Sequence, residues 1–138
     1  MKVLPLKWAV VATLVMSTAA VAHHSFAMFD RAKIVVLKGT VTSFQWTNPH
    51  AWIEIDVPDA GGKARSWGVE LNSPNNLTRQ GWKRTAVKPG DKVTIRVNPL
   101  RNGSPGGLFL DIVLPDGKVL DSGLPKDGTP VNTPLSQK

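Results

Sequence analysis

From residue 34 to residue 114 the chain repeatedly alternates apolar and polar side chains, which is the period-two pattern of half-buried β-strands. The clearest case is the segment 51–57, in which Ile53, Ile55 and Val57 fall on one face while Trp52 and two carboxylates fall on the other. We expect the apolar face to contact the core. Similar patterns predict further strands at residues 34–44, 63–71, 92–97 and 108–114.

The first predicted strand, residues 34–44, departs from strict alternation at two points. Gly39 interrupts a run rich in β-branched residues, and the apolar step from Val41 to Phe44 covers three residues instead of two. A glycine inside a strand and a shift in its alternation both indicate a β-bulge or a sharp bend. We therefore expect this strand to bend from one face of the sheet to another.

One short segment follows the rules of a helix. Ser73 suits the N-cap position, and Pro74 suits the first helical position, where its missing N–H costs nothing. Residues 75–80 supply the turns with Leu77 facing inward, and Gly81 is placed to end the helix. The sequence therefore predicts a short helix between the third and fourth strands.

Five strands with a short helix between the third and the fourth follow the element order of the OB-fold. We predict an all-β fold with one short helix, a five-stranded OB-fold-like Greek-key barrel. An immunoglobulin-like sandwich is the alternative, but it needs about seven strands and no helix. The barrel domain is expected at residues 33–120, after an irregular lead-in at 23–32. Residues 121–138, which are poor in apolar side chains, are expected to form a flexible tail.

The start of the chain has the three parts of a secretory signal peptide. Lys2 and Lys7 form a basic region, residues 8–16 are apolar, and residues 20–22 (Ala-Val-Ala) suit signal peptidase. We expect residues 1–22 to be cleaved and the mature protein to be periplasmic or secreted. An uncleaved membrane anchor is the alternative, but the apolar run is shorter than the ~20 residues that cross a bilayer. No membrane span is expected after cleavage.

The chain carries 17 basic and 10 acidic residues, a formal net charge of +7. Loss of Lys2 and Lys7 with the signal peptide reduces the excess to five. The basic residues are scattered, with Lys83 and Arg84 the one adjacent pair, so a solvated surface is the simpler interpretation and no nucleic-acid partner is expected. The absence of cysteine excludes disulfides, thiolate metal sites and cysteine nucleophiles.

The sequence shows no motif of an enzyme. Glu54 and Asp56 lie two residues apart on a strand, but alternation on a solvated face explains them. The segment 103–107 contains glycines, but it includes a proline and does not lead into a helix, unlike a phosphate-binding loop. We therefore predict that the protein is not an enzyme but a non-catalytic binding or accessory domain of the cell envelope.

The histidines supply a chemical signal of a different kind. Cleavage after Ala22 would make His23 the first residue, so that its α-amino group and Nδ1 could chelate a metal ion together. His50 is the expected partner and His24 a further ligand, which gives a nitrogen set that favours copper(II), with zinc as the competing ion. A periplasmic copper-binding protein is therefore the alternative function.

The turn before the second strand suggests a second kind of site. Trp46 and Trp52 bracket it, Asn48 shapes it, and His50 lies at its end, near the strands against which OB-folds bind ligands. Trp82 is expected to approach the same end. We expect these five residues to bind a small ligand, a glycan or an envelope protein. The alternative is that the tryptophans fill the core and His50 bonds to loop backbone.

Six short motifs distinguish the chain. They are Ala-His-His-Ser-Phe at 22–26, Gly-Thr-Val-Thr at 39–42, Trp-Thr-Asn-Pro-His-Ala-Trp at 46–52, Ser-Pro-Asn at 73–75, Arg-Gln-Gly-Trp at 79–82 and Lys-Pro-Gly-Asp at 88–91. In combination they resemble a family of exported bacterial small β-barrel proteins catalogued as a domain of unknown function. The resemblance covers about residues 23–120. It implies a small secreted or periplasmic β domain and brings no established activity.

Overall fold

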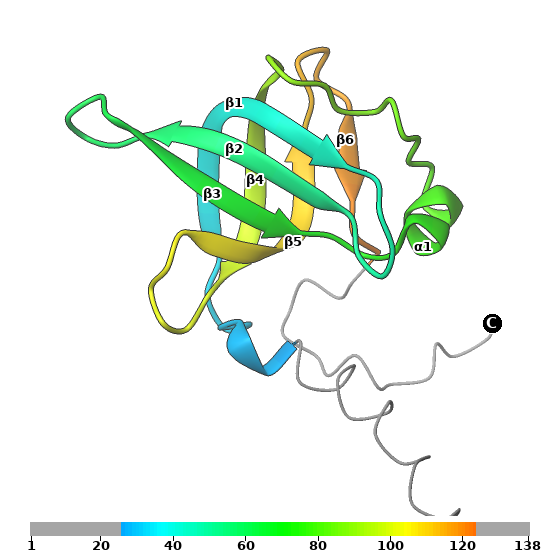
Figure 1. Ribbon diagram of the computed structural model, residues 1–138, viewed down its shortest axis with the longest axis horizontal. Helices are drawn as coiled ribbons and strands as arrows, with labels where there is room; N and C mark the ends of the chain where they lie inside the picture. Colours follow the sequence, from blue (N-terminus) through cyan, green and yellow to red (C-terminus); the bar gives the residue numbers. More distant parts are fainter. Residues whose placement is uncertain (1–25, 124–138) are drawn as a thin grey trace, which may run out of the picture.

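The computed structural model describes residues 26–123. The predicted signal peptide, His23, His24 and the part of the predicted tail from residue 124 lie outside these residues. The described chain forms six strands, one α-helix and one 3-10 turn (Figure 1). Their bounds are η1 Phe26–Met28, β1 Val35–Gln45, β2 Trp52–Pro58, β3 Ala64–Glu70, α1 Pro74–Arg79, β4 Lys92–Pro99, β5 Gly106–Val113 and β6 Val119–Asp121.

Five of the strands close into a barrel. Hydrogen-bonded neighbours run in the order β3-β2-β1-β4-β5, each pair antiparallel. A parallel pairing between β3 and β5 then closes the circle. Figure 1 shows the strongly curved β1 and the helix α1 in the connection from β3 to β4. This arrangement confirms the predicted five-stranded OB-fold-like barrel with one short helix.

Because β1 bends, it belongs to both halves of the barrel. Its first half pairs with β4 and its second half pairs with β2. At the bend, a Cβ on Gly39 would lie 2.1 Å from the carbonyl oxygen of Asp56, so only glycine allows β1 and β2 to approach this closely. The pairing register shifts between Val41 and Ser43, which confirms the predicted bulge.

The alternation in β2 places its side chains as predicted. Ile53 and Ile55 are fully buried, whereas Trp52 is exposed. The barrel strands, α1 and the segment after it contribute to one apolar cluster. Its largest fully buried members are Trp82, Phe109, Leu37, Ile53, Ile55, Leu77, Ile95 and Ile112. Burial of this apolar surface stabilises the fold.

Within residues 26–123, no helix is long and apolar enough to cross a membrane.

The structure confirms the predicted helix. Ser73 is the N-cap and its hydroxyl accepts a backbone hydrogen bond from three residues further on, while Pro74 occupies the first turn. Gly81 follows the helix with a φ of 86°, a conformation that favours glycine. Leu77 is fully buried, so this single helix face packs against the barrel core.

A sixth strand, which the sequence analysis did not predict, extends the sheet beyond β5. β6 pairs antiparallel with β5, and its Leu120 is buried in the core. The indole Nε1 of Trp82 donates a hydrogen bond to the backbone carbonyl of Asp121 over 2.9 Å, and Ser122 is buried as well. The folded domain therefore continues past residue 120, and Asp121 and Ser122 belong to it and not to a tail.

Candidate functional site

His50 and Glu70 form a close polar contact at the rim of the barrel. His50 lies in the loop between β1 and β2, just after the cis peptide bond of Asn48–Pro49, and Glu70 is the last residue of β3. His50 Nδ1 and Glu70 Oε1 are 2.5 Å apart. The side chain of Glu70 is 8% exposed and that of His50 is 33% exposed. The contact therefore joins a buried carboxylate to a half-buried imidazole.

Backbone hydrogen bonds fix the positions of both residues. The N–H of Ala51 donates to the carbonyl of Asn72 over 3.1 Å, and the N–H of Leu71 donates to the carbonyl of Ala51 over 2.9 Å. These bonds continue the pairing of β2 and β3 by one step, directly beside His50 and Glu70. The two side chains therefore meet because the sheet holds their backbones next to each other.

The contact determines which ring nitrogen of His50 can bind a ligand. With Glu70 ionised, its carboxylate accepts a hydrogen bond from Nδ1 of His50. A neutral imidazole has one N–H, which leaves the lone pair of Nε2 available to a metal ion. Metal-binding histidines typically donate their other ring N–H to a carboxylate or carbonyl in this way.

Sequence reasoning selected His50 but missed Glu70. The two residues are far apart in the chain, and Glu70 falls at the end of a predicted strand, where a charged residue is unremarkable. The usable signal was the pairing of the second and third strands as a hairpin, which brings the start of one strand to the end of the other. Such pairing indicates which backbone segments lie side by side, but it does not indicate which two side chains are in contact.

A small cavity adjoins this pair. Its volume is about 20 Å³, and its lining consists of Phe26, His50, Glu70, Leu71, Asn72, Leu108 and Phe109. A cavity of this size has room for one water molecule or one ion. Phe26 is the first residue that the structure describes, so the N-terminal part of the described chain contributes to the same cavity as His50.

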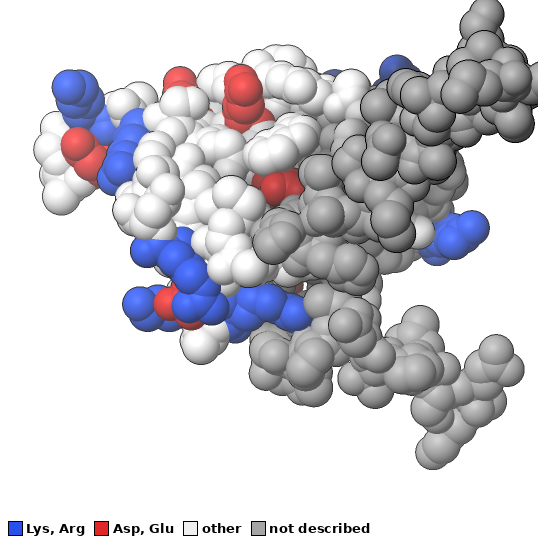
Figure 2. Space-filling view, turned by 60° about the horizontal axis from the view of Figure 1, so that its bottom comes forward, with Lys and Arg blue, Asp and Glu red and all other residues white. Residues whose placement is uncertain are grey.

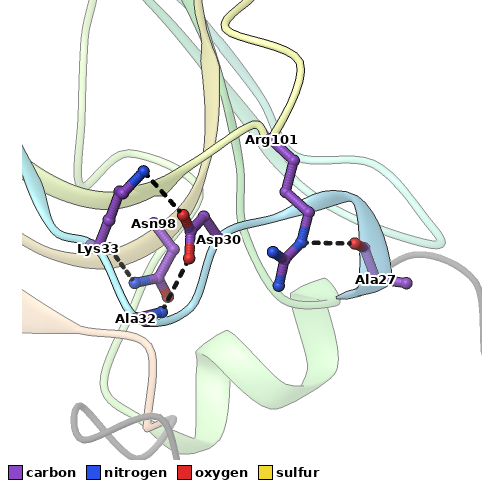
Figure 3. Close-up of polar contacts among 6 residues, drawn as sticks. All are labelled: Ala27, Asp30, Ala32, Lys33, Asn98 and Arg101. Carbon is purple, nitrogen blue, oxygen red and sulfur yellow. Dashed lines mark hydrogen bonds and ion pairs between the residues drawn. The ribbon is translucent and has the colours of Figure 1, made fainter.

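Side-chain hydrogen bonds hold the segment 26–33 against the strand β4 and the loop after it (Figure 3). Arg101 Nε donates to the carbonyl of Ala27 over 3.1 Å, and Asn98 Nδ2 donates to the carbonyl of Lys33 over 2.7 Å. This anchoring holds Phe26 at the cavity. The sequence predicted only an irregular lead-in, because hydrogen bonds from side chains so distant in the chain leave no periodic pattern.

Asp30 adds a local contact within the same segment. Its carboxylate accepts a hydrogen bond from the N–H of Ala32 over 3.3 Å and lies 3.2 Å from Lys33 Nζ (Figure 3). The hydrogen bond with Lys33 is the main reason that the pKa of Asp30 lies below its ordinary value of 3.8. The ionised form of Asp30 therefore favours the anchored conformation of the segment.

The predicted tryptophan surface is only partly formed. Trp52 is 38% exposed and Asn48 is exposed. Trp46 is half-buried, and its ring packs edge-on against the ring of Phe44, with 5.7 Å between the ring centroids. Trp82 is 1% exposed, so its assignment as a ligand-binding residue was wrong. The indole can lie in the core because its N–H donates a hydrogen bond to the backbone carbonyl of Asp121 in β6.

The predicted metal ligands fall into two groups. His50 lies at the rim of the barrel, whereas His23 and His24 lie outside the described residues. Within residues 26–123, no group of three or more His, Asp or Glu side chains could hold a metal ion.

A larger groove lies at the other end of β2 and β5. Its volume is about 420 Å³, within the ~300–1,000 Å³ of small-molecule sites. Its lining includes Lys38, Pro58, Lys92, Thr94 and Val113. None of the predicted site residues lines this groove.

On the face drawn in Figure 2, acidic side chains lie among the lysines and arginines.

The chain is similar to solved structures of one DNA-binding protein, the mitochondrial single-stranded DNA binding protein Rim1 from S. cerevisiae. One crystal form is 14% identical with a TM-score of 0.44, and the match covers 66% of this chain and 97% of that chain. A second form is 12% identical with a TM-score of 0.45, covering 67% and 98%. At this identity the similarity concerns the fold alone. No curated protein matches the chain.

The exclusion of a nucleic-acid partner was wrong. The solved structures to which the chain is similar are single-stranded DNA binding proteins, in contrast to that expectation. The exclusion is withdrawn, and because the similarity concerns the fold, DNA binding is not assigned to this chain in its place.

Most of the chain also matches the model of a protein family. The match covers residues 11–109, more than half of the 138 residues, and the family is described as a family of unknown function, DUF6152. It includes the barrel from β1 into β5 and the loop that carries His50. The chain therefore belongs to the DUF6152 family, a domain of unknown function, as the resemblance of its motifs predicted.

Proposed function

We propose that the protein is an exported, non-catalytic binding domain of the cell envelope whose ligand is a copper(II) ion. The ion is held between His50 and the histidines at the start of the mature chain. The signal-peptide pattern of residues 1–22 supports export. The observation that carries the copper assignment is that His50, in contact with a buried carboxylate, shares a small cavity with Phe26.

The two histidines directly precede Phe26 in the sequence, and Phe26 lines the same cavity as His50. A chain spans at most ~3.3–3.6 Å per residue, so the Cα of His24 lies within about 7 Å of the Cα of Phe26 and that of His23 within about 11 Å. These distances are comparable to the size of a metal site with its side chains.

The size of the cavity favours an ion over an organic ligand at this rim. Its volume of about 20 Å³ exceeds the ~10–15 Å³ that one water molecule needs. It is far below the ~300 Å³ at which small-molecule sites begin. A sugar or a cofactor does not fit beside His50 and Glu70, whereas a single ion does.

The available donor atoms favour copper(II) over other divalent ions. Cleavage after Ala22 provides an α-amino nitrogen and Nδ1 from His23, and the barrel provides Nε2 from His50. His24 adds a further imidazole. Nitrogen donors bind copper(II) most tightly in the order of divalent first-row metals, and zinc is the competing ion.

The exposure of Trp52 favours a second candidate function, the binding of a glycan or an envelope protein. Trp52 is 38% exposed on β2, next to the loop that contains the exposed Asn48. A partly exposed indole presents an apolar face for stacking and an N–H for hydrogen bonding. Trp52 does not line the small cavity. A substitution of Trp52 therefore tests the binding of a glycan or protein without changing the proposed metal site.

The copper proposal is tested on the mature protein purified after export. Mass spectrometry establishes whether the chain begins at His23, and copper(II) is titrated against a competing chelator. We compare the wild type with His23→Ala, His50→Ala and Gln45→Ala, the last as an exposed control at the end of β1. We expect His23→Ala and His50→Ala to weaken binding by at least about tenfold, because even changes around the ligands cost 10–100-fold.

Three results would overturn the copper proposal. They are a mature chain that begins at another residue, no copper binding by the wild type, and equal affinity in all four proteins. Trp52→Ala serves the second candidate function. If it abolishes capture of glycans or envelope proteins while copper binding is unchanged, the exposed tryptophan is the binding surface.

A further inference from the structure

We propose that the groove of about 420 Å³ at the ends of β2 and β5 binds a small organic phosphate. Its ligand is an organic molecule whose phosphate monoester group contacts Lys38 and Lys92. The groove shares no lining residue with the cavity beside His50, so this second site does not depend on the copper function.

The pairing of β1 with β4 brings two lysines and two threonines onto one face of the sheet. Lys38 lies opposite Thr94, and Thr40 lies opposite Lys92. The two pairs are two residues apart, so all four side chains point to the same side. Val93, which lies between the two residues of β4, is buried in the core. The four polar side chains therefore point away from the core, and all four residues line the groove.

The two lysines are close enough to bind one anionic group together. In the register of β1 and β4, Lys38 and Lys92 are diagonal neighbours, which lie about 7–8 Å apart in an antiparallel pair. Each ammonium group is carried on a flexible four-carbon chain, so both can reach one group placed between them. A phosphate monoester has a charge of about −1.5 to −2 at pH 7, which two ammonium groups balance.

The groove is positively charged because no acidic side chain lines it. The ion pairs in the described part of the chain involve other basic residues, and neither Lys38 nor Lys92 takes part in one. Both lysines are exposed. Their charges are therefore available to a ligand from solution.

The carboxylates that flank the lining residues lie outside the groove. Those of Asp59, Asp91 and Asp116 accept backbone N–H hydrogen bonds within their own turns. Asp56 lies opposite Thr40 in the pairing of β1 with β2, but it does not line the groove. The groove therefore attracts an anion despite these neighbours.

The remaining lining residues suit the organic part of the ligand. Thr40 and Thr94 are half-buried, and their hydroxyls form no hydrogen bond with another residue of the segment 26–123, so each can donate one to a phosphate oxygen. Pro58, Val113 and Pro115 add apolar surface. The volume lies in the ~300–1,000 Å³ range of small-molecule sites and leaves room for a carbon ring beside the phosphate group.

The test uses phenyl phosphate, a phosphate monoester on an apolar ring, with the metal-free protein. Backbone ¹H–¹⁵N NMR shifts report both the dissociation constant and the place of binding. Benzoate keeps the ring but carries a single charge, and inorganic phosphate keeps the charge but lacks the ring. We expect phenyl phosphate to shift the amides of Lys38, Thr94 and Val113 saturably and to bind at least about threefold more tightly than either comparison anion.

Three substitutions separate the groove lysines from the overall charge of the protein. Lys38→Gln and Lys92→Gln each remove one charge from the groove, whereas Lys83→Gln removes one from an exposed lysine outside it. We expect each groove variant to weaken the binding of phenyl phosphate by about threefold to tenfold and the double variant to weaken it further. Lys83→Gln should leave it unchanged. Circular dichroism confirms that each variant is folded.

Four results would overturn the proposal. They are the absence of saturable shifts, shifts confined to residues outside the groove, an equal loss of affinity in Lys83→Gln, and binding of benzoate or inorganic phosphate as tight as that of phenyl phosphate. If a variant does not fold, the place of the wild-type shifts and the comparison of the three anions decide. The copper titration is a separate experiment, so either site can fail while the other stands.

Discussion

The bend of β1 gives the sharpest prediction for the fold. The perturbation is Gly39→Ala, which adds one Cβ at the point where β1 passes from β4 to β2. That atom would lie 2.1 Å from the carbonyl oxygen and 2.9 Å from the carbonyl carbon of Asp56, whereas real Cβ atoms stay beyond 3.0 Å. The obstacle is backbone, which cannot rotate away like a side chain, so the two strands must separate by about 1 Å.

The cost follows from this separation. The pairing of Thr40 with Asp56 lies at the collision, and loss of about two backbone hydrogen bonds costs ~2 kcal/mol at about 1 kcal/mol each. Strain from the inserted carbon adds about 1 kcal/mol or more. We expect about 3 kcal/mol of destabilisation, which lowers the melting temperature of a domain of this size by about 12–24 °C. Gly39→Val is expected to be worse, because it adds two further methyl groups.

The assay is thermal unfolding followed by circular dichroism, with urea unfolding for the free energy. The control is Gly68→Ala in β3, a second strand glycine whose added Cβ meets nothing within 4 Å. This variant should remain within about 1 kcal/mol of the wild type and can gain stability, since alanine loses less conformational freedom on folding. An unchanged melting temperature for Gly39→Ala, or an equal loss in both variants, would refute the reasoning.

The remaining predictions concern the core and the anchored segment. Trp82→Phe should cost about 2–3 kcal/mol in urea unfolding, because it leaves a cavity and removes the hydrogen bond to the carbonyl of Asp121. The exposed control Trp52→Phe should cost less than about 1 kcal/mol, and similar losses would contradict the buried position of Trp82. Carboxyl ¹³C NMR should show an Asp30 pKa below 3.8 that rises towards 3.8 in Lys33→Ala. Because the folded pKa is lowered, the anchoring by Asp30 is present above the unfolded pKa and is lost as the pH falls through the folded value. An Asp30 pKa that does not change in Lys33→Ala would contradict this.

Local rules of the sequence predicted much of the barrel. Alternation identified five strands, and the apolar step at Val41 located the bulge in β1. The helix followed from Ser73, Pro74 and Gly81, whose roles depend on neighbours a few residues away. β6 was missed because a strand of three residues is too short for alternation to stand out from the surrounding turns.

The predicted site was less complete for a physical reason. Trp46, Trp52 and Trp82 have similar signals in the sequence, yet they are half-buried, exposed and fully buried in the structure. Alternation states which residues share a face of a strand. It does not state which loop or strand covers that face, because this depends on segments that are distant in the chain.

The sequence by itself determined β1 to β5, the helix and the bend, since these result from backbone conformation and from side chains a few positions apart. It also identified the histidines as the candidate metal ligands, because imidazole is a common metal-binding group in any fold. Only the tertiary structure decided that Glu70 holds His50, that the segment from Phe26 is fastened to the β4–β5 end, and that Trp82 lies in the core. Each of these depends on closure of the barrel, which brings together side chains that no local pattern connects.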